Sequence, residues 1–389
     1  MHGPQVEHTR ALCREWVESG PGHAISACVA RRGVIVLHEA FGRLRPEVSA
    51  PALETRSIYP LSSATKPITA TLAMQLVEEG RLGLNRPVRE YLPEVTSEGS
   101  DAMLVHHLLT HTAGYVFHTD PVMVKHMLEK AAGGFEAPPC PEAQHPILHQ
   151  MNALFYDAPL AFAPGQEMVY SNINYEFLGE IIRRVSGRSL EDLARERIFD
   201  PLGMRDTWYV VPEAEDARVV KRPSEWAMET PGNPFWQGLN SRQVQETPFA
   251  GAGVFSTPLD IAAFAQCFLD AGRHGDTRIL SPATVRAMTR NQIPGIPARL
   301  LDFHAPEASW GYGWTVESPV KWEGYNGSLW SLGSFSHSGA GGIVFWVDPA
   351  QEVVGVYFEV AKLWEEAGTM GMEWKADLFQ NAIMAAIED

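Results

Sequence analysis

Ser63 and Lys66 stand three residues apart, a spacing that one turn of helix converts into contact between their side chains. The apolar residues Ile68, Leu72 and Leu76 follow at every fourth position, which predicts a helix that begins close to Ser63. A serine becomes a good nucleophile when a neighbouring base takes its proton, and a lysine can assist only if burial lowers its pKa. Ser63 is therefore a candidate nucleophile, although a helix-capping serine beside a solvated lysine is the alternative for this motif alone.

Two later stretches could complete such a site. Tyr170 and Asn172 lie on a loop that enters a helix predicted over residues 176–186. A phenol beside a lysine can act as a general base near neutral pH, and an amide can hold the lysine or a substrate carbonyl. His337 opens a glycine-rich strand edge, where a substrate backbone can approach closely and find free N–H groups. Taken alone, the Tyr170 stretch could be a helix cap with a packed tyrosine, and the His337 stretch could be a tight turn.

Other chemistries find little support. His106, His107 and His111 have helical spacing, but no H-E-x-x-H pattern accompanies them, so a metal site is not expected. The glycines of 251–253 follow no βαβ pattern, which argues against nucleotide binding. A G-x-S-x-G elbow is absent from the sequence, so an α/β-hydrolase is not indicated.

Composition and charge narrow the class of partner. The 389 residues are 45% hydrophobic, which is typical of a globular protein. The formal net charge of −16 disfavours nucleic acid and membrane surfaces as partners. Small uncharged substrates are unaffected by this argument. The sequence shows no apolar leader and no apolar run of about 18 residues, which predicts a cytoplasmic protein. The four cysteines are far apart, so reduced thiols are expected.

The secondary-structure pattern predicts a mixed fold. Runs of β-type residues occur at 24–38 and at 311–359, and helical patterns fill most of the chain between them. This order predicts an α/β (α+β) fold with one antiparallel sheet built from both chain termini and flanked by helices. A last helix is expected over residues 372–386.

The same pattern predicts two domains. We expect residues 1–85 and 250–389 to form the sheet domain, and residues 86–249 to form an inserted, mainly helical domain. Residues 205–250 are irregular and rich in aromatic side chains, which is typical of loops that cover a pocket. Packed irregular structure is the alternative for these loops.

Together and in this order, the three stretches resemble the serine β-lactamase and penicillin-recognising superfamily. The resemblance is closest to its class C branch and to the related family VIII carboxylesterases, and it spans about residue 20 to residue 360. It implies a β-lactamase/transpeptidase-like fold. Further stretches similar to landmarks of that family are Leu108–Gly114, Phe162–Gly165, Ala250–Thr257 and Phe345–Pro349.

The resemblance implies a role for each residue of the three stretches. Ser63 would be acylated with Lys66 as its partner, and Tyr170 would deprotonate first the serine and later a water molecule. Asn172 would orient Lys66 and the substrate, and no metal or cofactor would be needed. The remaining implied positions are His337, Ser338 and Gly339 along the binding strand, and the backbone N–H groups of Ser63 and Ala340 as the oxyanion hole.

One position departs from the family pattern. β-Lactamases and peptidases of this superfamily typically carry a lysine where His337 stands, and that cation attracts a substrate carboxylate. A neutral imidazole in a protein of charge −16 favours small uncharged acyl esters instead, so a carboxylesterase is the expectation. The alternatives are a β-lactamase, a D-amino-acid peptidase or amidase, an acyltransferase, and a binding homologue without activity.

Overall fold

The computed structural model describes residues 1–20, 22–117, 120–141, 144–229, 232–300, 303–320, 326–366, 369–373 and 375–388. The helices are α1 (Gly3–Ser19), α2 (Lys66–Glu78), α3 (Val105–Leu109), α4 (Pro121–Ala132), α5 (Pro146–Phe155), α6 (Asn172–Ser186), α7 (Leu190–Ala194), α8 (Arg242–Glu246), α9 (Pro258–Leu269), α10 (Pro282–Met288) and α11 (Ala376–Met384). The strands of the main sheet are β1 (Ala24–Arg31), β2 (Val34–Gly42), β10 (Thr315–Val316), β11 (Phe335–Gly339), β12 (Ile343–Asp348) and β13 (Val353–Glu359). Shorter strands are β3 (Tyr59–Pro60), β4 (Met168–Val169), β5 (Phe255–Ser256), β6 (Arg273–His274), β7 (Thr277–Arg278), β8 (Ala298–Leu300), β9 (Phe303–Ala305), β14 (Lys362–Glu366) and β15 (Thr369–Glu373).

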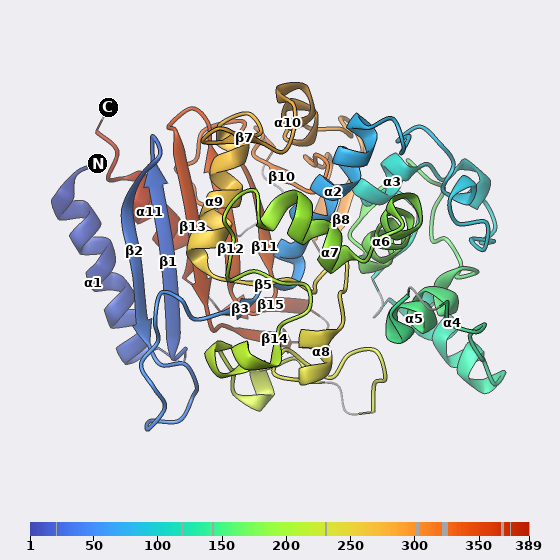
Figure 1. Cartoon of the computed structure of the whole chain (residues 1–389), viewed down its shortest axis with the longest axis horizontal. Coiled ribbons are helices and arrows are strands. Elements are labelled where there is room, and N and C mark those ends of the chain that lie inside the picture. Colours follow the sequence, from blue (N-terminus) through green and yellow to red (C-terminus); the bar gives the residue numbers. More distant parts are fainter. Residues whose placement is uncertain are drawn as a thin grey trace.

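The main sheet joins the two ends of the chain, as the sequence predicts. Its order is β10-β11-β12-β13-β1-β2, and every neighbouring pair is antiparallel (Figure 1). The pairing of β1 with β13 runs from Ile25 opposite Glu359 to Arg31 opposite Val353. The short loops after β1 and β12 are the hairpins expected between adjacent antiparallel strands.

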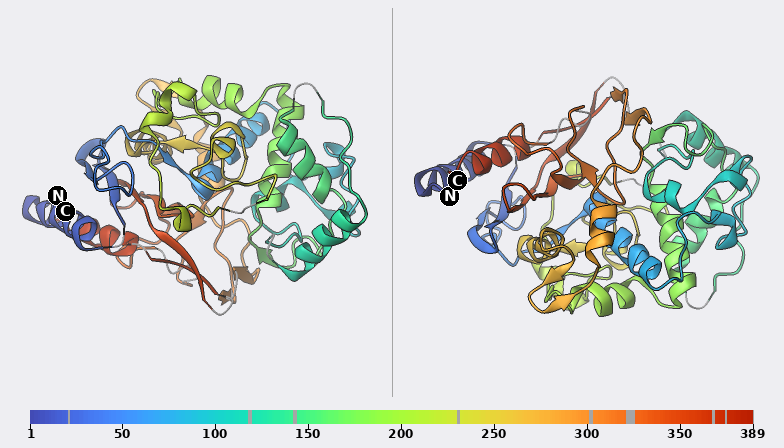
Figure 2. Two further views of the ribbon diagram at one scale, coloured as in Figure 1. Left: turned by 90° about the horizontal axis from the view of Figure 1, so that it is seen from below. Right: turned by 90° about the horizontal axis from the view of Figure 1, so that it is seen from above.

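Helices cover both faces of this sheet, which explains why every residue of β1, β12 and β13 is buried. One face packs on α1 and α11, with Val6, Cys13 and Phe379 among the buried side chains. The two helices lie side by side and bring both termini to the same end of the molecule (Figure 2). The other face packs on α9 and, through a larger core, on α2.

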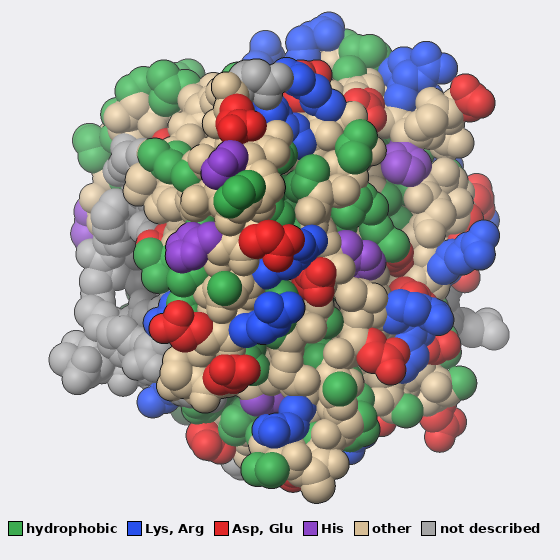
Figure 3. Space-filling model, turned by 90° about the vertical axis from the view of Figure 1, so that its left-hand side faces the viewer, with side chains coloured by type: hydrophobic (Ala, Val, Ile, Leu, Met, Phe, Trp, Pro, Cys, Tyr) green, Lys and Arg blue, Asp and Glu red, His purple; other side chains and the backbone are tan. Residues whose placement is uncertain are grey.

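The outer face over α1 carries acidic and basic side chains interspersed with one another (Figure 3). Arg10, for example, pairs with Glu7 of its own helix and with Glu39 of β2. Within the described ranges, no helix is both long and apolar enough to cross a membrane. All four cysteines are free thiols, and Cys140 is the exposed one.

Helix α2 lies between the sheet and the helical part of the molecule, where α6 and α7 pack against it and α3 packs against α6 (Figure 1). It contains Lys66 at its first position and Pro67 just after, where the missing N–H of proline leaves no intrahelical bond broken. The division into a sheet domain and a helical domain at residues 86 and 249 stays a prediction.

Three stretches differ from the sequence expectations. Residues 369–373 form β15, which pairs with β14, so the last helix begins at Ala376 rather than at residue 372. The pairing with β14 provides hydrogen-bond partners for the backbone of residues 369–373, which a longer helix would have bonded internally. Helix α5 was not expected, and the strand predicted from residue 311 is limited to Thr315–Val316.

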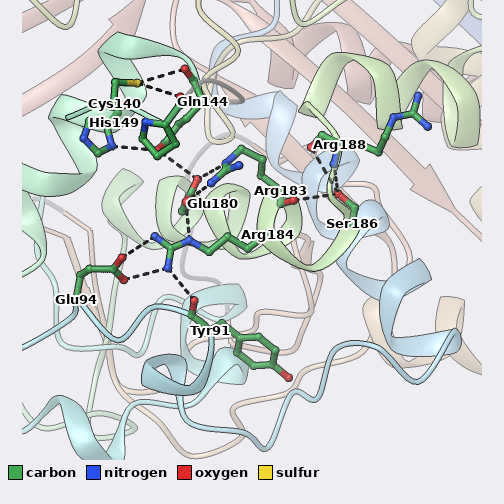
Figure 4. Close-up of polar contacts among 11 residues, drawn as sticks. Tyr91, Glu94, Cys140, Gln144, His149, Glu180, Arg183, Arg184, Ser186 and Arg188 are labelled. Atoms are coloured by element: carbon green, nitrogen blue, oxygen red, sulfur yellow. Dashed lines mark hydrogen bonds and ion pairs between the residues drawn. The ribbon is translucent and has the colours of Figure 1, made fainter. Parts of the chain in front are cut away.

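A buried ion-pair network anchors the far end of α6 (Figure 4). The carboxylate of Glu180, whose side chain is 2% exposed, accepts hydrogen bonds from Arg183 at 2.8 Å and from Arg184 at 2.7 Å. Arg184 also binds the carboxylate of Glu94 at 2.9 and 3.0 Å and the carbonyl of Tyr91 at 3.1 Å. These contacts tie α6, which begins at Asn172, to the loop before α3.

We expect Arg184→Gln to lower the free energy of unfolding by about 1–3 kcal/mol, because buried Glu180 loses one of its two arginines. Arg188→Gln is the matched control, since it removes an exposed ion pair with Glu196 and should cost less than about 0.5 kcal/mol. Urea denaturation measures both changes, and equal losses in the two variants would contradict a structural role for the network.

Candidate active site

Ser63 lies in a tight 3₁₀ turn, Ser62–Thr65, that leads directly into α2. The preceding Ser62 has a φ of 49°, a conformation that costs energy in a residue other than glycine. Its hydroxyl donates a hydrogen bond to the carbonyl of Ala340 at 3.0 Å, which ties this turn to the end of β11. Ser63 itself is half-buried.

Lys66 is fully buried directly behind Ser63. Its Nζ lies 3.3 Å from Ser63 Oγ, 2.8 Å from Asn172 Oδ1 and 2.8 Å from the carbonyl of Gly251. Burial lowers the pKa of Lys66 from 10.5 to about 7. A neutral amine in this position can donate to Asn172 and Gly251 and use its lone pair to accept the Ser63 proton. The geometry therefore provides a base for the serine at neutral pH.

Tyr170 and Asn172 meet at the same amine, as the sequence predicts. The centre of the Tyr170 ring lies 4.7 Å from Lys66 Nζ, and Asn172 is the first residue of α6. The helix thus starts a turn earlier than its apolar pattern indicates. The ring of Tyr175, one turn into the helix, lies 5.4 Å from the same nitrogen. Two aromatic faces and an amide oxygen therefore surround Lys66.

Glu176 is a site residue that sequence reasoning missed. Its carboxylate is buried and accepts hydrogen bonds from the backbone N–H groups of Ala250 at 3.1 Å and Gly251 at 2.9 Å. The carbonyl of Gly251 in turn accepts from Lys66. Burial raises the pKa of Glu176 to about 7, and its negative charge opposes the lowering of the Lys66 pKa. Glu176 thus fixes the peptide that holds Lys66 and influences its charge.

The predicted binding strand is β11, which passes beside the Ser63 turn. His337 is buried, and its Nδ1–H donates to the carbonyl of Ser338 at 2.7 Å. Burial, together with the nearby charge of Lys66, lowers the pKa of His337 to about 3, so the imidazole is neutral at pH 7. A Cβ atom on Gly339 would overlap the carbonyl oxygen of Leu61, so a glycine is required where the strand approaches the turn.

His111 is a second residue whose place the sequence did not reveal. Its Nδ1 accepts from the backbone N–H of Ser171 at 3.2 Å and from Asn174 Nδ2 at 3.3 Å. Its ring centre lies 4.3 Å from that of Tyr170. Burial holds the pKa of His111 well below its usual value, so a neutral ring supports the tyrosine. Among the described residues, no three His, Cys, Asp or Glu side chains gather as a metal site would require.

We expect Glu176→Gln to lower the pKa of Lys66 further, because the substitution removes the negative charge that raises it. The ε-carbon resonance of Lys66, followed by NMR in protein with ¹³C-labelled lysine, should titrate near pH 7 in the wild type and at lower pH in the variant. The exposed carboxylate of Glu246 supplies the control Glu246→Gln, which should leave that titration in place. An unchanged titration in Glu176→Gln would show that the carboxylate has no influence on Lys66.

Comparisons with a family model, a sequence relative and solved structures all indicate the same family. The beta-lactamase family model matches residues 12–368. Esterase EstB of Burkholderia gladioli is 33% identical over 196 residues, which cover 49% of this chain and 47% of that protein. A penicillin-binding protein homologue from Caulobacter crescentus has the same fold with a TM-score of 0.76, at 22% identity and with 98% of both chains covered.

A second solved structure, a family VIII carboxylesterase, matches with a TM-score of 0.73 at 20% identity and covers 99% of this chain and 98% of its own. These matches confirm the β-lactamase/transpeptidase-like fold and the resemblance read from the sequence. The family model spans most of the chain, so the assignment of this chain to the family does not depend on the short stretches alone. The protein belongs to the beta-lactamase family of serine hydrolases.

Proposed function

We propose that this protein is a carboxylesterase that cleaves small uncharged esters through an acyl-enzyme on Ser63. The observation that carries the proposal is the buried Lys66, whose amine contacts Ser63 and whose pKa is lowered to about 7. A serine with such a neighbour can lose its proton at neutral pH. The substrate class that follows is a small molecule that carries an ester, and no cofactor is required.

In the first step the oxygen of Ser63 attacks the ester carbonyl carbon, and the serine proton passes to Lys66 or, through it, to Tyr170. The carbonyl π electrons move onto oxygen, where the N–H groups of Ser63 and Ala340 would bind the oxyanion. The tetrahedral intermediate collapses as the bond to the alcohol oxygen breaks. That oxygen takes the proton back from the lysine–tyrosine pair, so the alcohol leaves neutral and Ser63 is acylated.

The second step repeats the same transfers with water in place of serine. Tyr170 or Lys66 accepts a proton from water as its oxygen attacks the acyl carbon, and the carboxylic acid leaves when the bond to Ser63 breaks. Ser63 recovers its proton from the same pair. Asn172 keeps the amine oriented through both steps, because its Oδ1 accepts from Lys66 at 2.8 Å.

His337 supports an uncharged substrate. Its imidazole is buried and neutral, so β11 offers at this position no cation for a substrate carboxylate. The partial likeness to EstB, which is named an esterase, also favours ester cleavage. The match to the beta-lactamase family favours a second candidate, hydrolysis of a β-lactam or of a D-amino-acid peptide by the same residues. Transfer of the acyl group to an alcohol or amine other than water would use the same intermediate.

Parallel assays separate the two candidates. We expect the wild type to hydrolyse p-nitrophenyl butyrate at least about tenfold more efficiently than a chromogenic cephalosporin, because His337 offers the cephalosporin carboxylate no charge. Ser63→Ala should abolish both ester cleavage and labelling by a fluorophosphonate, and Ser19→Ala on α1 is the matched control that should retain them.

The proposal would be wrong if cephalosporin turnover were fast and ester turnover negligible. Retention of ester cleavage by Ser63→Ala would also overturn it, since the nucleophile would then be elsewhere. Addition of a primary alcohol to the assay, followed by product analysis, tests for acyl transfer in the same experiment.

A further inference from the structure

Arg222 is a buried arginine behind the proposed oxyanion hole. Its residue exposure is 2%, and its backbone is held by a reciprocal pair of hydrogen bonds with the side chain of Asn240, at 2.9 and 2.7 Å. The residue lies between the short turn Glu213–Arg218 and the turn Ser224–Trp226, outside every motif read from the sequence. Its position is therefore set by packing and not by a local pattern.

The guanidinium carries a charge that the described residues do not neutralise. Its Nη2 donates to the carbonyl of Gly341 at 3.2 Å. In the described part of the chain, Nε and Nη1 have no hydrogen-bond partner, and no carboxylate forms an ion pair with this group. Burial lowers the pKa of Arg222 to about 10, so the side chain still carries its charge at pH 7. An unpaired buried cation is costly to a fold, which calls for a functional explanation.

The turn that the guanidinium contacts follows the predicted oxyanion donor directly. Gly341 comes next after Ala340 and has a φ of 90°, a conformation that favours glycine. A Cβ atom on Gly341 would lie only 3.1 Å from Arg222 Nε and 3.2 Å from Nη2, so the guanidinium lies against this backbone. The carbonyl of Gly341 also accepts from the N–H of Ala361 at 3.0 Å.

We propose that Arg222 is a positioning residue for the oxyanion hole. Its side chain holds the Ala340–Gly341 turn and adds positive potential where the oxyanion develops. The inference rests on the proposed function, because it concerns the same tetrahedral intermediate. A fixed charge close to the turn interacts weakly with a neutral ester and more strongly with the oxyanion, so it favours the transition state over the bound substrate. The side chain is too deeply buried to bind a substrate carboxylate itself.

Three substitutions separate charge from structure. Arg222→Gln and Arg222→Met remove the charge, and Arg222→Lys keeps it. We expect kcat/KM for p-nitrophenyl butyrate to fall by about 10- to 100-fold in the uncharged variants, with KM nearly unchanged. A boronic acid forms a tetrahedral anion on Ser63, and its inhibition constant should rise by a similar factor in the uncharged variants. Arg222→Lys should remain within about fivefold of the wild type in both measurements.

Arg184→Gln is the matched control for loss of a partly buried arginine. Arg184 lies 12 residues along α6 from Asn172, about 18 Å at 1.5 Å per residue, and its loss should lower stability without changing kcat/KM. A loss of stability in Arg222→Gln similar to that in Arg184→Gln, with kcat/KM within twofold of the wild type, would overturn the inference and leave Arg222 a purely structural residue.

The remaining outcomes also decide the question. If the uncharged variants do not fold, a folded Arg222→Lys that loses about 100-fold in kcat/KM would contradict the role of the charge, and retained activity would support it. A wild type without ester cleavage that depends on Ser63 would remove the proposed function and this inference together. Ser63-dependent cleavage with an insensitive Arg222 would remove the inference alone.

Discussion

The burial of Lys66 is the constraint on which the site depends. An amine that is removed from water must either lose its charge or form hydrogen bonds with the protein. Lys66 does both to some extent. The amine is met by Ser63, Asn172 and the carbonyl of Gly251, and its pKa is lowered to about 7. The same burial that costs stability makes the lysine a base that Ser63 can use.

Several elements of the fold hold the Lys66 amine in place. Helix α6 brings Asn172 and Tyr175 to it, and Glu176 of the same helix holds the peptide of Gly251. The main sheet supplies β11, whose Gly339 allows the close approach to the Ser63 turn. The sheet therefore contacts the Ser63 turn, and α6 contacts Lys66 directly behind that turn.

The residues that local spacing could reveal were found from the sequence, because one helical turn or a short loop determines which neighbours can meet. Ser63 and Lys66 are of this kind, whereas Asn172 meets Lys66 across 106 residues and was assigned from the family resemblance. The antiparallel sheet was predictable for a similar reason, since each strand has its own apolar run. Glu176 acts on Gly251 across 75 residues, and Arg222 on Gly341 across 119, so neither contact leaves a local pattern.

The central claim is that the chemistry starts on Ser63 and needs the buried amine of Lys66. Mass spectrometry of the protein quenched with acid within seconds of mixing with p-nitrophenyl butyrate tests this most directly. The account predicts a butyryl adduct on the peptide that contains Ser63, and no adduct in Lys66→Met over the same time. An adduct on another residue, or acylation of Lys66→Met at the wild-type rate, would contradict it.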